Sequence, residues 1–169
     1  MAGSRLPGDA MTLLKRIRTI VSHPAVGLVM RVYLGGIFIY ASMSKINYPA
    51  EFAESIAAYQ LVPHWALHPM ALLMPWLELI SGVLLVVGVR TRAAAAAVGG
   101  MLAVFSLAVL LALLRGIPAG CGCFSSVEEP LGWGTFARDL LWLAMAVRVF
   151  AGPSALQLES LIFKSLREA

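Results

Sequence analysis

The two cysteines of the chain, Cys121 and Cys123, are separated by a single residue in the stretch AGCGCFSS. A structural disulfide normally closes a long loop, because most of its stabilising effect comes from restricting the unfolded chain. A bridge across one residue restricts almost nothing, and it requires a backbone bend that Gly120 and Gly122 permit. Strain of this kind makes a disulfide easier to reduce. The spacing therefore predicts a redox-active pair that exchanges electrons.

The thiols leave two other interpretations open. Two thiolates can bind a soft metal such as Cu(I), and some of the eight methionines could assist, although none of them adjoins the cysteines in the sequence. The pair could also be inert. His64 and His68 have the spacing of two metal ligands on one helical face, but prolines bracket them and no acidic or thiol ligand lies nearby. We therefore predict no metal site at the histidines.

Charged side chains inside apolar segments are the second candidate for chemistry, because they are expensive in a membrane and commonly functional there. Glu78 and Arg138 lie within two such segments, and Lys45 lies at the end of a third. All three are expected in the outer half of the membrane, where the basic side chains could reach the carboxylate. Asp139 is an alternative partner for Arg138. The sequence predicts that these four side chains form a polar cluster below the thiols, which either handles their protons or only orients the helices.

The rest of the chain is too apolar for a soluble domain. Of its 169 residues 60% are hydrophobic and 13% are charged, and the mean hydropathy is +0.83. Four apolar segments approach the length of about 20 residues that a membrane-spanning helix needs: 25–44, 70–89, 93–114 and 135–150. The third is rich in Ala and Gly and is the expected central packing helix. The predicted fold class is an all-α integral membrane protein, a four-transmembrane-helix bundle with flanking interfacial amphipathic helices.

The predicted organisation has three parts. Residues 1–24 form a cytoplasmic tail with an interfacial basic helix, residues 25–150 the membrane domain, and residues 151–169 a cytoplasmic amphipathic helix. The first apolar segment is longer than a signal-peptide core, so we expect it to be retained. Lysines and arginines gather in both terminal regions and the second connection, which places the termini in the cytoplasm and the cysteine loop outside. The net charge of +4 is then attributed to contact with anionic lipid and not with nucleic acid.

Two further elements are expected at the outer face. Pro49 fits the start of an amphipathic helix along the membrane surface, and Pro63 and Pro69 end it. Three apolar side chains share one face of this helix: Phe52, Ile56 and Tyr59. Thr135 has the residue type of an N-cap, so the fourth apolar helix would begin beside the cysteine loop with the positive end of its dipole there. That positive end, together with Arg138, favours the thiolate form of a cysteine.

Several stretches taken together resemble one known family. They are RVYLGGIFIYASMSKINYPAEFAESIAAYQLVP, PWLELISGVLLVVG, and CGCF followed by LGWGTFARDLLWL, and they span roughly residues 31–150. These stretches look like the DoxX-like superfamily, and most closely its methylamine utilisation protein MauE branch. The resemblance implies a four-helix protein of the bacterial cytoplasmic membrane, associated with disulfide chemistry in the cell envelope and often with a thioredoxin-like partner. In the MauE branch it implies a link to maturation of the disulfide-rich small subunit of methylamine dehydrogenase.

The resemblance also implies roles for individual residues. It makes Cys121 and Cys123 the redox pair. It marks three charged residues as motif residues: Lys45, Glu78 and Arg138. The family usually has a glycine after the phenylalanine of CGCF, and this chain has Ser125 there, which leaves the thiols intact but changes the expected turn.

The functional prediction is a membrane thiol-disulfide oxidoreductase that exchanges electrons between Cys121 and Cys123 and an extracytoplasmic thioredoxin-like protein. If the protein is an oxidase, a quinone is the natural acceptor on the lipid side, with Arg138 or Lys45 polarising its carbonyl; if it is a reductase, the cysteine loop must receive electrons from the cytoplasmic side. The alternative is a non-catalytic membrane scaffold or a soft-metal carrier that binds or transports Cu(I). The direction of electron flow stays open, and the small-residue helix faces are compatible with a homo-oligomer.

Overall fold

The computed structural model describes residues 23–117 and 132–152, and within these two ranges the chain forms helices joined by short connections. The described elements are α2 (Pro24–Asn47), α3 (Pro49–Ala58), α4 (His64–Val87), α5 (Thr91–Arg115) and α6 (Trp133–Ala151). The predicted interfacial helices near both termini, and the cysteines Cys121 and Cys123, lie outside the described residues.

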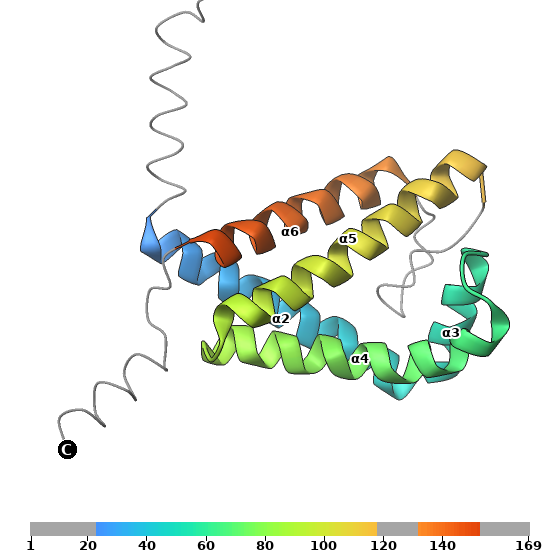
Figure 1. Ribbon diagram of the computed structural model, residues 1–169, viewed down its shortest axis with the longest axis horizontal. Coiled ribbons are helices and arrows are strands. Elements are labelled where there is room, and N and C mark those ends of the chain that lie inside the picture. The colour runs from blue at the N-terminus through green and yellow to red at the C-terminus, as the bar shows by residue number, and fades with distance from the viewer. Residues whose placement is uncertain (1–22, 118–131, 153–169) are drawn as a thin grey trace, which may run out of the picture.

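The four long helices run alternately in opposite directions along the bundle (Figure 1). α2 packs most extensively against α4, and α5 against α6. The end of α2, all of α3, the start of α4, the end of α5 and the start of α6 lie at one end of the bundle, which we call the α3 end (Figure 1). The last described residue before the cysteines, Ile117, and the first one after them, Gly132, therefore both lie at this end.

Three of the helices are long and apolar enough to cross a membrane: Ala25–Asn47, His64–Val87 and Thr91–Arg115. α6 is 19 residues long and runs beside α5, but it does not meet this criterion (Figure 1). Three charged side chains dilute its apolar character: Arg138, Asp139 and Arg148. The chain is thus a multi-pass membrane protein with three candidate spans, and the predicted count of four is not confirmed.

Two glycines allow a close approach where α2 crosses α4. A Cβ atom built on Gly35 would lie 2.7 Å from the carbonyl oxygen of Gly82, and one built on Gly82 would lie 2.8 Å from the carbonyl oxygen of Gly35. Small residues permit this approach, which gains dispersion contacts where burial of apolar surface gives little. In the Ala-rich α5, by contrast, a Cβ on Gly99 would meet Ala146 at an ordinary 3.7 Å. Among the described glycines, the tight helix contact is therefore that of Gly35 and Gly82, between the first two long helices.

Substitution of Gly35 by a larger residue should push α2 and α4 apart where they cross. We expect Gly35→Ala to lower the free energy of unfolding by about 1–3 kcal/mol, the usual cost of overpacking. The added methyl would also lie 2.7 Å from Cγ2 of Val86, so it meets atoms on two sides. The measurement is equilibrium unfolding of the purified protein in mixed detergent micelles.

Gly36 provides the matched control, because a Cβ there has no neighbouring atom within 4 Å. Gly36→Ala should leave stability unchanged or raise it by up to about 1 kcal/mol, the helix propensity gained over glycine. Equal effects of the two alanines would contradict a tight crossing at Gly35.

Two expected helix boundaries are wrong. α4 begins at His64, so Pro69 lies inside this helix and does not end the preceding one. Pro69 is the sixth residue of α4, so it removes one backbone hydrogen bond of this helix but does not end it. α6 begins at Trp133 with Gly132 as its N-cap, so Thr135 is buried within the first turn instead of capping it. The N-terminus of α6, and with it the positive pole of the helix dipole, still lies at the α3 end.

Candidate functional site

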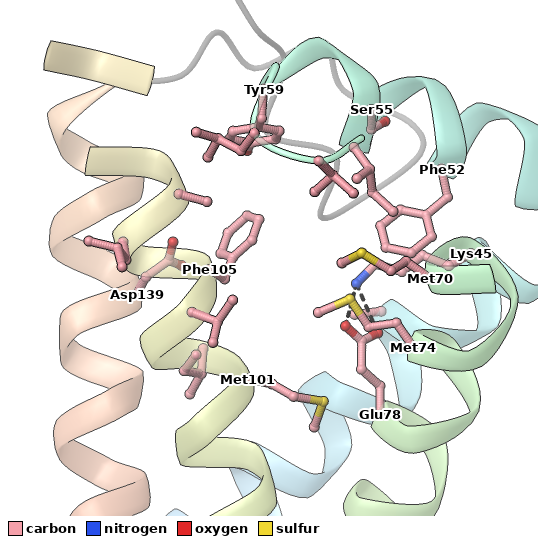
Figure 2. Close-up of a pocket in the computed structure, with 18 of the residues that line it drawn as sticks. Lys45, Phe52, Ser55, Tyr59, Met70, Met74, Glu78, Met101, Phe105 and Asp139 are labelled. Atoms are coloured by element: carbon pink, nitrogen blue, oxygen red, sulfur yellow. Dashed lines mark hydrogen bonds and ion pairs between the residues drawn. The ribbon is translucent and has the colours of Figure 1, made fainter. Parts of the chain in front are cut away.

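A cavity of about 410 Å³ lies among the helices and is bordered at one end by α3 (Figure 2). Its lining is mostly apolar, and five of the lining side chains are aromatic: Phe38, Phe52, Tyr59, Phe105 and Trp142. Tyr59 and Phe105 meet edge to face, with ring centres 6.2 Å apart, and join α3 to α5. The spacing that predicted a shared face for Phe52, Ile56 and Tyr59 is confirmed, because all three line this cavity.

One wall of the cavity carries a buried ion pair. The Nζ atom of Lys45, in the last turn of α2, donates to both carboxylate oxygens of Glu78 at 2.6 and 2.8 Å. The two side chains are 11% and 9% exposed. The ammonium also lies 4.9 Å from the centre of the Phe52 ring, on α3. The pair is therefore satisfied by hydrogen bonds and by an aromatic face, as a buried charge must be.

A second charge pair comes from neighbouring residues of α6. Nε of Arg138 lies 3.5 Å from Oδ1 of Asp139, and the guanidinium carbon lies 4.8 Å from the centre of the Trp142 ring. Asp139 is fully buried, and among the described residues neither of its carboxylate oxygens has a hydrogen-bond partner. Successive side chains on a helix do not face each other, which explains the loose contact. A buried carboxylate is thus left with unused acceptors.

The two pairs lie on different walls. Asp139 lines the cavity from α6, and Lys45 and Glu78 line it from α2 and α4 on the opposite side (Figure 2). The sequence predicted one polar cluster of four residues, and the structure has two pairs with an apolar space between them. A ligand in this space would meet an ammonium on one side and a carboxylate on the other.

Sequence reasoning missed three thioethers of this cavity. Met70 and Met74, one turn apart on α4, line it together with Met101 of α5 (Figure 2). The spacing of the first two is a helical signal that the sequence contains, but Met101 joins them only through the packing of α4 and α5. Three soft ligands are therefore available near the Lys45–Glu78 pair.

The histidines do not belong to this site. His64 and His68 lie on the first turns of α4 and are exposed. Within the described ranges, no group of three or more His, Cys, Asp or Glu side chains is placed to hold a metal ion. The described structure therefore gives the histidines no further ligands.

Comparisons with known proteins agree with this membrane architecture. The family model described as methylamine utilisation protein MauE matches residues 23–152. The chain is 32% identical to the methylamine utilization protein MauE of Paracoccus denitrificans over 77% of this chain and 71% of the relative. It is 31% identical to the protein of the same name in Methylorubrum extorquens, over 81% and 79% of the two chains.

A third relative has the same name and comes from Methylophilus methylotrophus, with 28% identity over 85% of this chain and 79% of the relative. No solved structure matches the chain. The family model covers most of the chain, including every described helix. The chain therefore belongs to the MauE family, membrane proteins involved in methylamine utilisation.

Proposed function

We propose that the chain is a thiol-disulfide oxidoreductase of the bacterial cytoplasmic membrane, in which α6 is the fourth spanning helix and both termini are cytoplasmic. Cys121 and Cys123 are the redox pair, and they exchange with an extracytoplasmic thioredoxin-like protein. One observation carries the proposal: the chain enters and leaves the cysteine segment at the end of the bundle where α3 borders a charge-lined cavity (Figure 1). This arrangement supports an outward thiol pair with polar groups in the membrane below it.

The reaction we propose oxidises the partner. A thiolate of the partner attacks the disulfide of Cys121 and Cys123, a mixed disulfide forms, and the second partner thiol resolves it. The partner is then a disulfide, and the chain is a dithiol. A membrane quinone next accepts two electrons and two protons from this dithiol, which restores the disulfide and yields quinol. The carboxylates of Glu78 and Asp139 are the buried groups in the described bundle suited to hold or pass these protons.

The pathway follows from the relatives. Their printed names place them in methylamine utilisation. We propose that the partner serves the maturation of a disulfide-rich enzyme such as methylamine dehydrogenase. A chain that reoxidises the partner would supply the oxidising equivalents that each new disulfide requires.

A soft-metal carrier is the second candidate, and one observation favours it. Met70, Met74 and Met101 offer thioether sulfurs in one cavity, and such ligands suit Cu(I). The carboxylate of Glu78 in the same cavity is already bound by the ammonium of Lys45, whose third proton suits a ligand oxygen and not a metal ion. The hydrogen-bond donor at this wall therefore favours a neutral ligand with an acceptor oxygen over a metal cation.

Trapping the exchange intermediate tests the proposal. In Cys121→Ser, the thiolate of Cys123 can attack the disulfide of an oxidised partner and displace one partner thiol, but the chain has no second thiol to release the mixed disulfide, so we expect it to persist on Cys123. It should appear on non-reducing gels from cells that express the protein, and mass spectrometry should identify a thioredoxin-like protein in the band.

The double variant Cys121→Ser/Cys123→Ser is the matched control and should trap nothing. If Cys121→Ser and the reciprocal Cys123→Ser both trap no partner, while the wild-type thiols never titrate against glutathione, the thiol exchange proposal is wrong. Retention of Cu(I) by the wild-type protein, lost on changing the three cavity methionines to Leu, would favour the metal carrier.

A further inference from the structure

The cavity carries charged side chains on two walls, which a purely apolar ligand would not need. Its volume of about 410 Å³ is within the range of small-molecule sites, which are mostly apolar with a few placed polar groups. We infer that the cavity binds the ring of a membrane quinone or quinol, with Lys45 at one pole and Asp139 at the other. The choice of a quinone rests on the proposed function, while the site consists of described residues alone.

The donor pole is Lys45. An ammonium has three protons to donate, and the carboxylate oxygens of Glu78 accept two hydrogen bonds from it, at 2.6 and 2.8 Å. The ammonium lines the cavity and is held in position by Glu78 and by the ring of Phe52. A third proton can therefore be donated to a ligand oxygen without breaking the ion pair.

The acceptor pole is Asp139. Its side chain is fully buried and lines the cavity from the opposite wall, and both of its oxygens lack hydrogen bonds within the described structure (Figure 2). A buried carboxylate without hydrogen bonds is costly, so a ligand that donates to it gains the energy of a charge-assisted bond. A quinol hydroxyl is such a donor, and a quinone oxygen is not.

The two poles select among the ligands that a bilayer offers. A lipid acyl chain would fill the apolar space but use neither pole. An anionic ligand would be repelled by Asp139, and a cationic ligand without an acceptor oxygen would leave the third proton of Lys45 unused. A quinol ring meets both requirements, because one oxygen accepts from Lys45 and the hydroxyl on the opposite side donates to Asp139, and its planar faces can pack against Phe105 and Trp142, which line the cavity.

Access from the bilayer fits the position of the cavity. Most of its lining comes from the three candidate membrane spans, and α6 supplies Asp139 and Trp142. We therefore expect the ligand to be one that dissolves in the membrane. A short-chain quinone is a suitable probe for the same reason.

Filling the cavity is the first test. The full chain in phospholipid nanodiscs is titrated with decylubiquinone, and binding is followed by quenching of tryptophan fluorescence. Ala108 of α5 lines the cavity, so Ala108→Trp should weaken binding at least about tenfold, equivalent to about 1.4 kcal/mol. Ala103 lies on the same helix but is exposed and not among the lining residues, so Ala103→Trp should bind like the wild type.

Removing the acceptor pole is the second test, and it does not depend on how well Ala108→Trp folds. We expect Asp139→Leu to weaken the binding of decylubiquinol about tenfold to a hundredfold, the range expected for one hydrogen bond to a charged group. Binding of decylubiquinone should change much less, because the quinone has no proton to donate. A change that only disturbed the fold would weaken both forms alike.

The outcomes separate this inference from the proposed function. Cys121→Ala/Cys123→Ala should bind both probes like the wild type, because the side chains that we assign to the site are all described residues. Normal probe binding with thiols that never exchange would overturn the thiol proposal alone. Unchanged binding in Ala108→Trp and Asp139→Leu, or displacement of the probe by simple alkanes as effective as the quinone, would overturn the cavity assignment, whatever the thiols do.

Discussion

Lys45→Met is expected to lower the free energy of unfolding by about 3–5 kcal/mol, the usual effect of breaking a buried ion pair by removing one partner. The carboxylate of Glu78 is only 9% exposed, and both of its oxygens depend on the ammonium for their hydrogen bonds. Without Lys45 a buried charge is left unpaired. The measurement is equilibrium unfolding in mixed detergent micelles, with helix content followed by circular dichroism.

A matched double variant separates the charge from the packing. Lys45→Met/Glu78→Leu removes both members of the pair, and apolar replacements of buried ion pairs are often neutral or stabilising. We expect it to recover most of the lost stability while losing the donor pole of the cavity. If Lys45→Met unfolds at the same midpoint as the wild type, the pair does not stabilise the bundle.

Asp139→Leu is expected to have the opposite signature, with greater stability and less activity. The carboxylate is fully buried with no hydrogen bond within the described structure, so its removal should raise the free energy of unfolding by about 1–3 kcal/mol. The adjoining cavity leaves space for the larger side chain. Reoxidation of the thiols by quinone should also slow, because a carboxylate suited to hold or pass the protons of the thiols is lost.

The control for this prediction is Asp139→Asn, which keeps a polar group of the same size in the same place. It should gain less stability than Asp139→Leu, because the amide must still be buried. The measurements are equilibrium unfolding and the rate of thiol reoxidation on the same preparations. Loss of stability in Asp139→Leu would mean that the contact with Arg138, at 3.5 Å, outweighs the cost of burying the carboxylate.

Local patterns in the sequence were sufficient for much of the fold. The runs of apolar residues predicted the positions of α2, α4 and α5, because a spanning helix depends on its own length and composition. The face of Phe52, Ile56 and Tyr59 was predicted from helical spacing, and it lines the cavity. Such features require no knowledge of neighbouring helices.

Features that depend on how the helices pack could not be predicted in the same way. The crossing at Gly35 and Gly82 lies away from the alanine-rich helix because backbone approach depends on which two small residues face each other. The charges divide into two pairs because Asp139 lines the cavity from α6, on the wall opposite Lys45 and Glu78. Burial and unused hydrogen-bond acceptors at Asp139 are properties of the packed bundle, and no local pattern encodes them.

The role of the thiols stays a prediction from the sequence, since Cys121 and Cys123 lie outside the described residues. Their spacing supports electron exchange. The described bundle adds a polar cavity at the end where the described residues stop before the cysteines and begin again after them. These features support the electron path that we propose, from a partner dithiol through the cysteine pair to a quinone.

Direct oxidation of the reduced chain by quinone tests this path. The purified protein is fully reduced, freed of reductant, placed in nanodiscs and mixed with decylubiquinone, and the remaining thiols are counted by alkylation and mass spectrometry while quinol is followed by absorbance. We predict one quinol for each disulfide formed between Cys121 and Cys123, and none in Cys121→Ser. Thiols that stay reduced with no quinol formed, in protein that binds the quinone, would contradict the proposed path.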